Sequence, residues 1–347
     1  VINFYYTPRT DLSYTVNYYL KDTTTKVADS KNVTGQTFGA SVTETAIDVA
    51  GYNKVDPTSA TITIAVEGNV INFYYTPRTD LSYTVNYYEQ GTTTSVAPSV
   101  TRNGQTFGTK VTEDAVDVTG YTKVDPTEKS ITIAAEGNVI NFYYVKRGDL
   151  FYTVNYYEKG TTTSVADSKT VAKQTFGAKV TEEAIDVDGY NKVDPTSATI
   201  TIAAEDNVIN FYYEKRTDLS YKVNYLEQGT NKVLSAAKTA DKQTFGASIT
   251  EKAIDIAGYN KVDPSEQTFV ITTGKNEITF YYTARTDLSY TVNYYLKDTT
   301  TKLADSKTIS GQTFGTKVTE DAIDISGYNK VDPTSATITI AVKDNVI

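Results

Sequence analysis

The chain repeats itself with a fixed period of 69 residues. The segment Val1–Tyr19 returns unchanged as Val70–Tyr88, and no insertion or deletion interrupts the spacing. Edited copies of the same segment begin at Val139, Val208 and Glu277. A constant period of this length is typical of tandem domains, so each period is expected to form one small structural unit. The last two residues match the start of a further copy, and we therefore expect the chain to be an excerpt from a longer protein.

The composition argues against several classes of function. The chain contains no Cys and no His, which removes disulfides, thiolate metal sites and the usual catalytic triads. Its net charge of −9 argues against nucleic acids and anionic membrane surfaces as partners. No apolar run approaches the roughly 18 residues of a membrane-spanning segment. Carboxylate pairs such as Glu44 and Asp48 remain, but a unit of this size leaves little room for a catalytic cleft. We expect no enzyme.

Tyr, Thr, Val and Ile dominate the repeat, which favours β-structure. From residue 14 onward apolar and polar residues alternate, and this period of two predicts a half-buried strand. One face consists of Tyr14, Val16 and Tyr18, and the other of Thr15, Asn17 and Tyr19. A second strand over 26–33 is expected to close a hairpin. A later strand, ending near residue 66, is expected to turn at 67–69 and pair with a returning strand over 71–75.

The middle of the repeat is the only part with helical character. Val42, Ala46 and Val49 share a helical face, so we expect one or two helical turns, or an irregular crossover, at 42–47. Before it lies Gln-Thr-Phe-Gly, which occurs in all five copies. Phe38 is expected to fill the core of its own repeat, and Gly39 to adopt a backbone conformation that other residues avoid.

Pro and polar residues at 76–79 mark the boundary between repeats. The domains are therefore expected at 11–75, 80–144, 149–213, 218–282 and 287–347, with 1–6 as the last strand of a preceding repeat and the fifth domain lacking that strand. Each domain is expected to be a sheet of about five strands. With linkers of about four residues, the array is expected to be a rod of roughly 150–200 Å, given a domain radius of gyration near 11 Å.

Each linker carries an Arg two residues before an Asp. An ion pair between them could pin adjacent domains, and a solvated charge in the linker explains the pattern equally well. The residues are Arg9, Asp11, Arg78, Asp80, Arg147, Asp149, Arg216, Asp218, Arg285 and Asp287.

The order of these motifs resembles a known family. Tyr-x-Val-x-Tyr at the start, Gly39 with Val42 and Thr43 in the middle, Gly51-Tyr52 after it and Val-Ile-x-Phe-x-Tyr at the end are similar to the MucBP (mucin-binding protein) repeat. The resemblance covers the whole chain five times over. It implies a tandem array of small β-grasp, ubiquitin-like domains of a β-rich α+β class, with at most one short helix each.

The resemblance also implies a place and a role. MucBP repeats occur in surface proteins of Gram-positive bacteria, so the chain is expected to be extracellular and anchored to the cell wall. Two functions stay open. The repeats are a stalk that projects the binding head of an adhesin, or they bind mucin or host glycans weakly and act through avidity.

The second alternative depends on the strand face opposite the predicted core. Sugars are held by aromatic faces with amide partners, and this face offers both in every period. The candidate glycan-binding residues are Tyr5, Asn17, Tyr19, Tyr74, Asn86 and Tyr88. No metal site is predicted, and weak calcium binding is left open because acidic residues recur in each period without a dense Asp-x-Asp-x-Asp loop.

The cut ends of the repeat pattern predict self-association. The fifth repeat lacks its Phe-Tyr-Tyr strand, whereas Val1–Tyr6 is that strand without a domain. Because an open sheet edge accepts such a strand, chains of this length are expected to associate head to tail.

Overall fold

The computed structural model describes every residue, Val1–Ile347, and consists of β-strands and connecting loops without a helix. Its contacts divide the chain into two units. One comprises Val1–Tyr152, Thr170–Val180 and Ile200–Asn207, and the other Thr153–Lys169, Thr181–Thr199 and Val208–Ile347. The first unit holds the first two repeats whole and the second holds the last two, so the fold is best described repeat by repeat.

The first repeat contains six strands, and the same six recur in the next three repeats. They are β1 (Leu12–Leu20), β2 (Lys26–Gln36), β3 (Ser41–Thr45), β4 (Tyr52–Val55), β5 (Ser59–Thr63) and β6 (Val70–Pro77). In the second repeat they are β7 (Leu81–Glu89), β8 (Ser95–Gln105), β9 (Lys110–Asp114), β10 (Tyr121–Val124), β11 (Glu128–Thr132) and β12 (Val139–Lys146).

In the third repeat they are β13 (Leu150–Glu158), β14 (Ser164–Gln174), β15 (Lys179–Glu183), β16 (Tyr190–Val193), β17 (Ser197–Thr201) and β18 (Val208–Lys215). In the fourth they are β19 (Leu219–Glu227), β20 (Val233–Gln243), β21 (Ser248–Lys252), β22 (Tyr259–Lys261), β23 (Glu266–Val270) and β24 (Glu277–Ala284). The fifth repeat has four strands, β25 (Leu288–Tyr295), β26 (Lys302–Gln312), β27 (Lys317–Asp321) and β28 (Ser335–Thr339).

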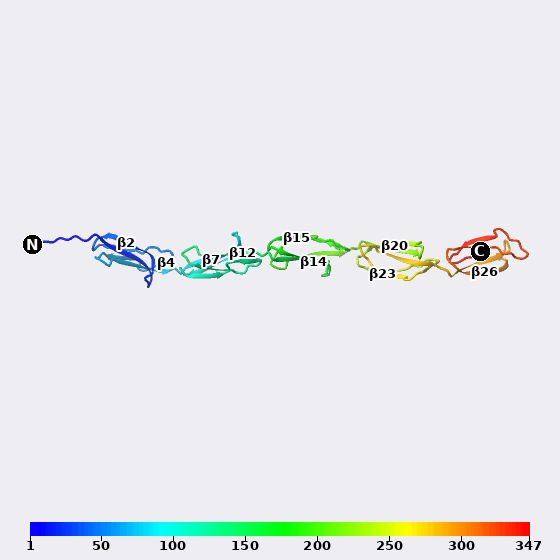
Figure 1. The fold of residues 1–347 in the computed structure, drawn as a ribbon, viewed down its shortest axis with the longest axis horizontal. Coiled ribbons are helices and arrows are strands. Elements are labelled where there is room, and N and C mark those ends of the chain that lie inside the picture. The colour runs from blue at the N-terminus through cyan, green and yellow to red at the C-terminus, as the bar shows by residue number, and fades with distance from the viewer. The chain divides into compact units, whose positions relative to one another are not determined.

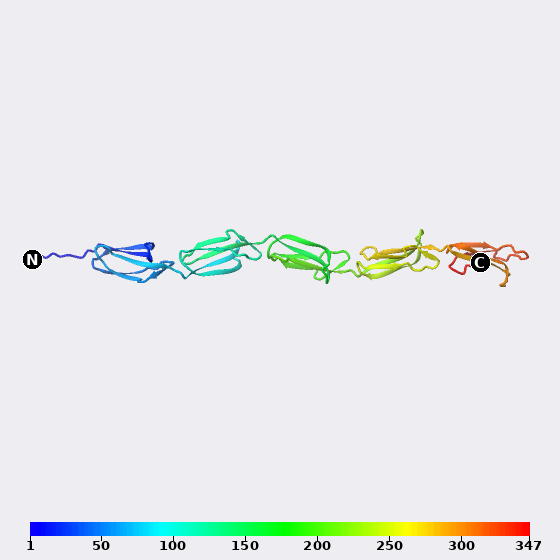
Figure 2. The ribbon, with the colours of Figure 1, turned by 90° about the horizontal axis from the view of Figure 1, so that it is seen from below.

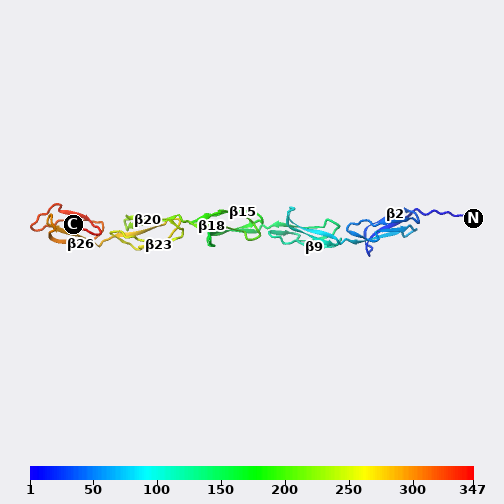
Figure 3. The ribbon, with the colours of Figure 1, turned by 180° about the vertical axis from the view of Figure 1, so that it is seen from behind.

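Each complete repeat is a sandwich of a four-stranded and a two-stranded sheet, and the two layers can be followed in Figure 2. In the first repeat the larger sheet has the order β2-β1-β6-β4, and the smaller sheet pairs β3 with β5. The long second strands, β2 and β26, are labelled in Figure 3. The first and last strands of the repeat, β1 and β6, pair in parallel from Thr15↔Val70 to Leu20↔Tyr75. A repeat is therefore complete only when its last strand is in place.

The core lies between the two sheets. The alternation predicted for β1 is confirmed, because Tyr14, Val16 and Tyr18 are buried. Phe73 and Tyr75 of β6 meet them from the neighbouring strand. The rings of Tyr18 and Phe73 stack with centroids 6.2 Å apart. Large aromatic side chains such as these dominate the energetics of a protein core.

The expectation of a β-grasp fold with a short helix is wrong. Residues 41–45, which overlap the stretch 42–47 where helical turns were expected, form β3, and Val42 pairs with Ile62 of β5. The physical reason is local. The segment is too short to nucleate a helix and is rich in β-branched residues, which favour strands. Across the pair, the hydroxyl groups of Thr43 and Thr61 lie 2.7 Å apart in a hydrogen bond. A two-stranded sheet thus replaces the helix as the second layer.

The hairpin expected between β5 and β6 is also absent. Strand β5 leaves for the smaller sheet, whereas β6 enters the larger one, so the turn at 67–69 joins two layers. Asn69 holds this turn. Its side-chain oxygen accepts from the amide of Ala65, and its side-chain nitrogen donates to the carbonyls of Ala65 and Ser13. Local alternation cannot distinguish a hairpin from such a crossing between layers, because both give the same inward-facing pattern.

A polar cluster ties the two layers together at one side. The hydroxyl of Tyr14 in β1 donates to Glu44 of β3 at 2.6 Å, and Lys31 of β2 donates to the same carboxylate at 2.7 Å. Equivalent clusters are Tyr83–Glu113–Arg102, Tyr221–Glu251–Lys238 and Tyr290–Glu320–Lys307. The hydrogen bond from Lys31, with that from Tyr14, lowers the pKa of Glu44 below its ordinary value. The same contact raises the pKa of Tyr14.

These clusters predict a loss of stability in acid. A carboxylate whose pKa is lowered by folding stabilises the fold above the pKa of the unfolded chain, near 4.5, and this contribution disappears as the pH falls through the lower folded value. The melting temperature is therefore expected to fall as the pH drops below about 4.5.

Calorimetry on a variant tests the assignment. Replacing Glu44, Glu113, Glu182, Glu251 and Glu320 by Gln should lower the melting temperature at neutral pH and reduce its decline in acid. Glu67→Gln, in an exposed turn, serves as the control and should change neither. An unchanged acid profile in the five-site variant would assign the acid sensitivity to other carboxylates.

Candidate functional site

The backbone of each of the four linkers between repeats is hydrogen-bonded to the repeats on both sides. The amide of Arg78 donates to the carbonyl of Gly51 in the first repeat at 2.9 Å, and the carbonyl of Arg78 accepts from the amide of Phe107 in the second repeat at 2.8 Å. The same pair of bonds forms at Arg147, Arg216 and Arg285. The linker backbone is therefore bonded to both of the repeats that it joins.

The ring of Phe107 packs on the backbone of the preceding repeat. A Cβ added to Gly51 would lie 2.3 Å from this ring, so a larger residue would have to displace the ring. Gly51 also has a φ of +86°, which side-chain-bearing residues rarely adopt. The next residue, Tyr52, meets the same ring edge to face with centroids 5.0 Å apart. The Phe of Gln-Thr-Phe-Gly in one repeat thus packs against the Gly-Tyr pair of the repeat before it.

We call this arrangement the junction, defined by Gly51, Tyr52, Arg78 and Phe107 and their equivalents. The other junctions are Gly120, Tyr121, Arg147 and Phe176; Gly189, Tyr190, Arg216 and Phe245; and Gly258, Tyr259, Arg285 and Phe314.

Phe38 shows what a junction covers. No Gly-Tyr pair lies against its ring in this structure, and it is 50% exposed, whereas Phe107 is half-buried. Phe38 was expected to fill the core of its own repeat, and it lies outside that core. Its counterparts Phe107, Phe245 and Phe314 do pack against the cores of their own repeats, and each also contacts the Gly-Tyr pair of the repeat before it. Gly39 has the predicted unusual backbone, with a φ of +77°.

The Arg and Asp of each linker pair with each other. Arg78 donates through two nitrogens to the two carboxylate oxygens of Asp80 at 2.9 and 2.8 Å, and this geometry recurs in all five linkers. The hydrogen bond from Arg78 lowers the pKa of Asp80. Both side chains are exposed, so the pair contributes little by itself. Its geometric effect is to fix the turn of the linker next to the two backbone bonds.

The predicted glycan-binding residues lie mostly on the outer face of the larger sheet, which the smaller sheet does not cover. The side-chain nitrogen of Asn17 donates to the side-chain oxygen of Asn72 at 2.9 Å, and the rings of Tyr19 and Tyr74 lie 6.5 Å apart. Tyr74 is 40% exposed. The four side chains therefore form one polar and aromatic surface, which we call the outer face.

Other members of the predicted set are elsewhere. Asn86 and Tyr88 occupy the same positions in β7 of the second repeat, where Asn86 donates to Asn141 at 2.9 Å. Tyr5 belongs to the unpaired stretch at the start of the chain, drawn in blue without a strand arrow in Figure 1. The fourth repeat departs from the pattern, because Leu226 and Thr279 replace Tyr19 and Asn72.

An open depression borders the outer face. The turn at 21–25 forms one side, Val55 and Asp56 the other, and Tyr74 lies between them.

No group of three or more acidic side chains is placed to hold a metal ion. No helix of the structure is long and apolar enough to cross a membrane.

The junction was missed by sequence reasoning, although its signal was present. Gln-Thr-Phe-Gly and Gly-Tyr both recur in all five copies, and a glycine followed by an aromatic residue at a domain end suggests a close contact. The partners are 56 residues apart and belong to different repeats, so periodicity within one repeat could not pair them.

Comparison with known proteins does not identify the family. No family model matches the chain, so the resemblance to MucBP repeats is not confirmed, and no curated protein matches it in sequence. Similar solved structures include the Bacillus anthracis TIE protein, at 11% identity and a TM-score of 0.30 over 80% of this chain and 67% of that one.

Mub-RV is similar at 13% identity and a TM-score of 0.16, over 39% of this chain and 98% of that one. A Streptococcal ancillary pilin is similar at 11% identity and a TM-score of 0.16, over 68% of this chain and 74% of that one. At these identities and TM-scores, the similarities carry no functional conclusion.

The junction predicts different effects for two glycine substitutions in the second repeat. Gly120→Ala should introduce a Cβ 2.4 Å from the ring of Phe176 and displace that ring. Gly137→Ala is the matched control, because its φ of +76° imposes similar backbone strain in open space. Both should destabilise the second repeat by about 1–2 kcal/mol, the cost of a left-handed residue that is not glycine.

Hydrogen exchange separates the two effects. Only Gly120→Ala should accelerate exchange at the amides of Arg147 and Phe176, which are hydrogen-bonded across the junction. Equal exchange in the two variants would mean that the Phe–Gly contact does not hold the junction together.

Proposed function

We propose that this chain is the repetitive stalk region of a bacterial cell-surface adhesin, which projects a binding head from the cell wall. In this role the protein is extracellular and wall-anchored, and its repeats act as spacers. The observation that carries the proposal is the junction, which recurs at all four linkers between repeats.

The junction supports a spacer because it restricts rotation in three ways at once. Backbone hydrogen bonds clamp the linker on both sides, the Phe ring is seated on a glycine, and the Arg–Asp pair holds the intervening turn. A flexible linker of the same length would have exposed, unpaired amides and no such contact. A linker with restricted rotation keeps the orientation of each repeat fixed relative to the next repeat. A stalk requires this.

Removing the Phe rings tests the stalk. A variant with Phe107, Phe176, Phe245 and Phe314 replaced by Ala should lose about 1–2 kcal/mol per junction, because a partly buried ring is truncated. In small-angle scattering the unaltered chain should be extended, and the variant should show a smaller radius of gyration and a broader distribution of distances.

The matched control is Phe38→Ala, whose ring is exposed and contacts no Gly-Tyr pair in this structure. It should leave the scattering curve unchanged. A compact unaltered chain, or a variant as extended as the unaltered chain, would contradict the stalk.

The outer face favours a second candidate function, in which the repeats themselves bind mucin or host glycans. Its observation is the exposed Tyr74 beside Asn72, next to an open depression. An aromatic ring with amide groups beside it is suited to stacking on a sugar and hydrogen-bonding its hydroxyls. One such face is shallow, so binding would depend on several repeats acting together.

Immobilised mucin glycans test this candidate. Binding of the full chain should exceed that of a fragment spanning 80–213 by far more than the ratio of repeat numbers, because linked weak sites gain about 10²–10⁴ in avidity. Replacing Tyr74, Tyr143 and Tyr212 by Ala should abolish it. Tyr281→Ala is the control, since the fourth repeat already lacks the Tyr and Asn partners. No signal from the full chain would exclude the candidate.

A further inference from the structure

The last strand of each complete repeat has one edge that is only partly paired. The amide of Lys21, just after β1, donates to the carbonyl of Tyr75. Because successive residues of a strand direct their backbone groups to opposite sides, Asn72 directs its carbonyl away from β1. On that side β4 reaches only as far as Val55, which pairs with Tyr74. The carbonyl of Asn72 is therefore left without a strand partner.

In the second repeat a lysine occupies this edge. The counterpart of Asn72 is Asn141, and the ammonium group of Lys129 donates to its backbone carbonyl at 2.6 Å. The same ammonium group lies 5.3 Å from the centre of the Tyr143 ring and 5.8 Å from that of Phe142. A carbonyl oxygen and aromatic faces both stabilise an ammonium ion. We call the carbonyl of Asn141 with these two rings, and its equivalents in other repeats, the edge site.

Lys129 reaches the edge site although a carboxylate lies opposite it. It pairs with Glu113 across strands β11 and β9. The carboxylate of Glu113 accepts hydrogen bonds from Tyr83 and Arg102 instead. The long side chain of Lys129 therefore extends to the open edge of β12. The edge site holds its ammonium group through a carbonyl and aromatic rings.

The fourth repeat fills the same position with an amide. Gln267 is the counterpart of Lys129, and its side-chain nitrogen donates to the backbone carbonyl of Thr279 at 3.1 Å. Two chemically different side chains thus place an N–H donor on the same edge carbonyl. The position accepts a nitrogen donor in both repeats.

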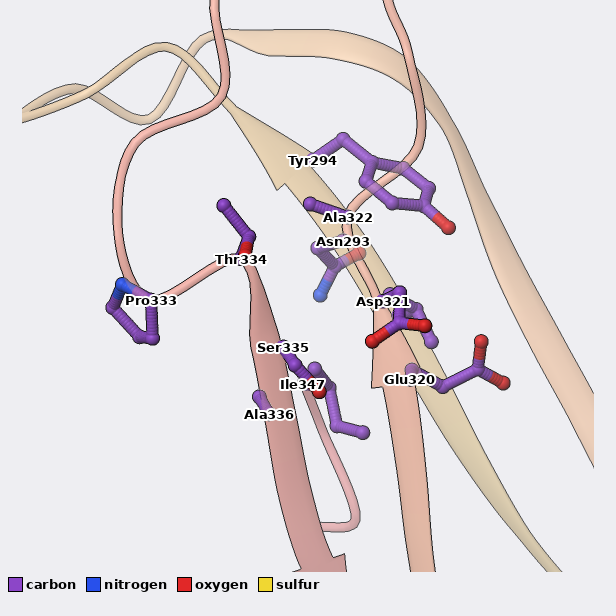
Figure 4. Close-up of a pocket in the computed structure, with 11 residues that line it drawn as sticks. Asn293, Tyr294, Glu320, Asp321, Ala322, Pro333, Thr334, Ser335, Ala336 and Ile347 are labelled. Atoms are coloured by element: carbon purple, nitrogen blue, oxygen red, sulfur yellow. The ribbon is translucent and has the colours of Figure 1, made fainter.

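The first and third repeats lack this internal donor. Ala60 and Ala198 stand where the second repeat has Lys129, and the fifth repeat has Ala336. Figure 4 shows the last of these on β28. The remaining parts of the edge site are retained in the first and third repeats, as Asn72, Phe73 and Tyr74 and as Asn210, Phe211 and Tyr212.

The exposure of the edge follows this difference. In the first repeat Tyr74 is 40% exposed and Asn72 is also exposed. In the second repeat Tyr143 and Asn141 are half-buried next to Lys129. The third repeat has the same exposure pattern as the first at these positions. The edge site is therefore open to solvent where the lysine is absent.

We propose that the edge sites of the first and third repeats bind a primary alkylammonium group of another molecule, in the place that Lys129 occupies in the second repeat. Such a group is carried by a lysine side chain or by a free polyamine. It donates to the carbonyl of Asn72 or Asn210 and lies against the ring of Tyr74 or Tyr212. The net charge of the chain, −9, favours a cationic ligand.

NMR titration of the full chain with n-butylammonium chloride at neutral pH tests the proposal. The amide resonances of Asn72 and Tyr74, and of their counterparts in the third repeat, should shift with saturation. Because so small a ligand binds weakly, the titration extends to about 50 mM. The resonances of Asn141 and Tyr143 should not respond, since Lys129 already fills that site. n-Butanol, which has the same carbon chain without the charge, should shift none of them.

Exchanging residues between repeats provides matched variants. Lys129→Ala gives the second repeat the residue of the first, and should make Asn141 and Tyr143 respond to n-butylammonium. Ala60→Lys gives the first repeat the residue of the second, and should abolish the response there while leaving that of the third repeat. Each substitution introduces a residue that another repeat already carries at this position, so both variants are expected to fold.

Two larger ligands identify the source of the ammonium group. Spermidine represents a free polyamine, and the peptide Gly-Lys-Gly with blocked ends represents a protein side chain, so the tighter binder identifies the class. Equal shifts in the first and second repeats of the unaltered chain, the same shifts with n-butanol, or no shift at the open sites would overturn the proposal. None of these outcomes affects the stalk, which depends on the junctions, or the glycan candidate, which is tested on mucin.

Discussion

The parallel pairing of the first and last strands is the interaction on which each repeat depends. Strand β1 has β2 on one side and β6 on the other, so the core between the sheets closes only when residues 55 positions apart meet. This pairing places Phe73 and Tyr75 under β1 and gives β4 its only partner. In the fifth repeat, where only Val346 and Ile347 of that strand are present, residues 328–331 form no strand, although their counterparts Tyr52–Val55 form β4.

The same strand also sets the geometry between repeats. Strand β6 ends at Pro77, and the next residue, Arg78, is already bonded to Gly51 of its own repeat and to Phe107 of the next. The linker is thus the continuation of the closing strand. One segment thus completes the core of its repeat and carries the chain into the next domain. No additional linker residues are therefore needed. This double role also explains why a Gly-Tyr pair and a Phe suffice to define the contact.

The two faces of the larger sheet differ in composition and in what covers them. The inner face is apolar and aromatic and holds the smaller sheet, with the Tyr14–Glu44 contact at its margin. The outer face carries paired amides and tyrosine rings and has no layer above it. Stalk and weak glycan binder are therefore not competing uses of the same surface. The first depends on the ends of the repeat, and the second on its outer face.

The sequence alone determined the period and the inward alternation of Tyr14, Val16 and Tyr18, because each of these is a local or strictly periodic pattern. It did not determine that residues 59–63 would leave their neighbour in sequence to pair with 41–45, nor that Phe107 would rest on Gly51. Both depend on contacts between segments distant along the chain, and alternation has the same form whichever layer a strand joins. Only the tertiary structure, in which buried apolar surface and backbone hydrogen bonds must be satisfied together, selects the second sheet in place of a helix and assigns the Phe to the neighbouring repeat.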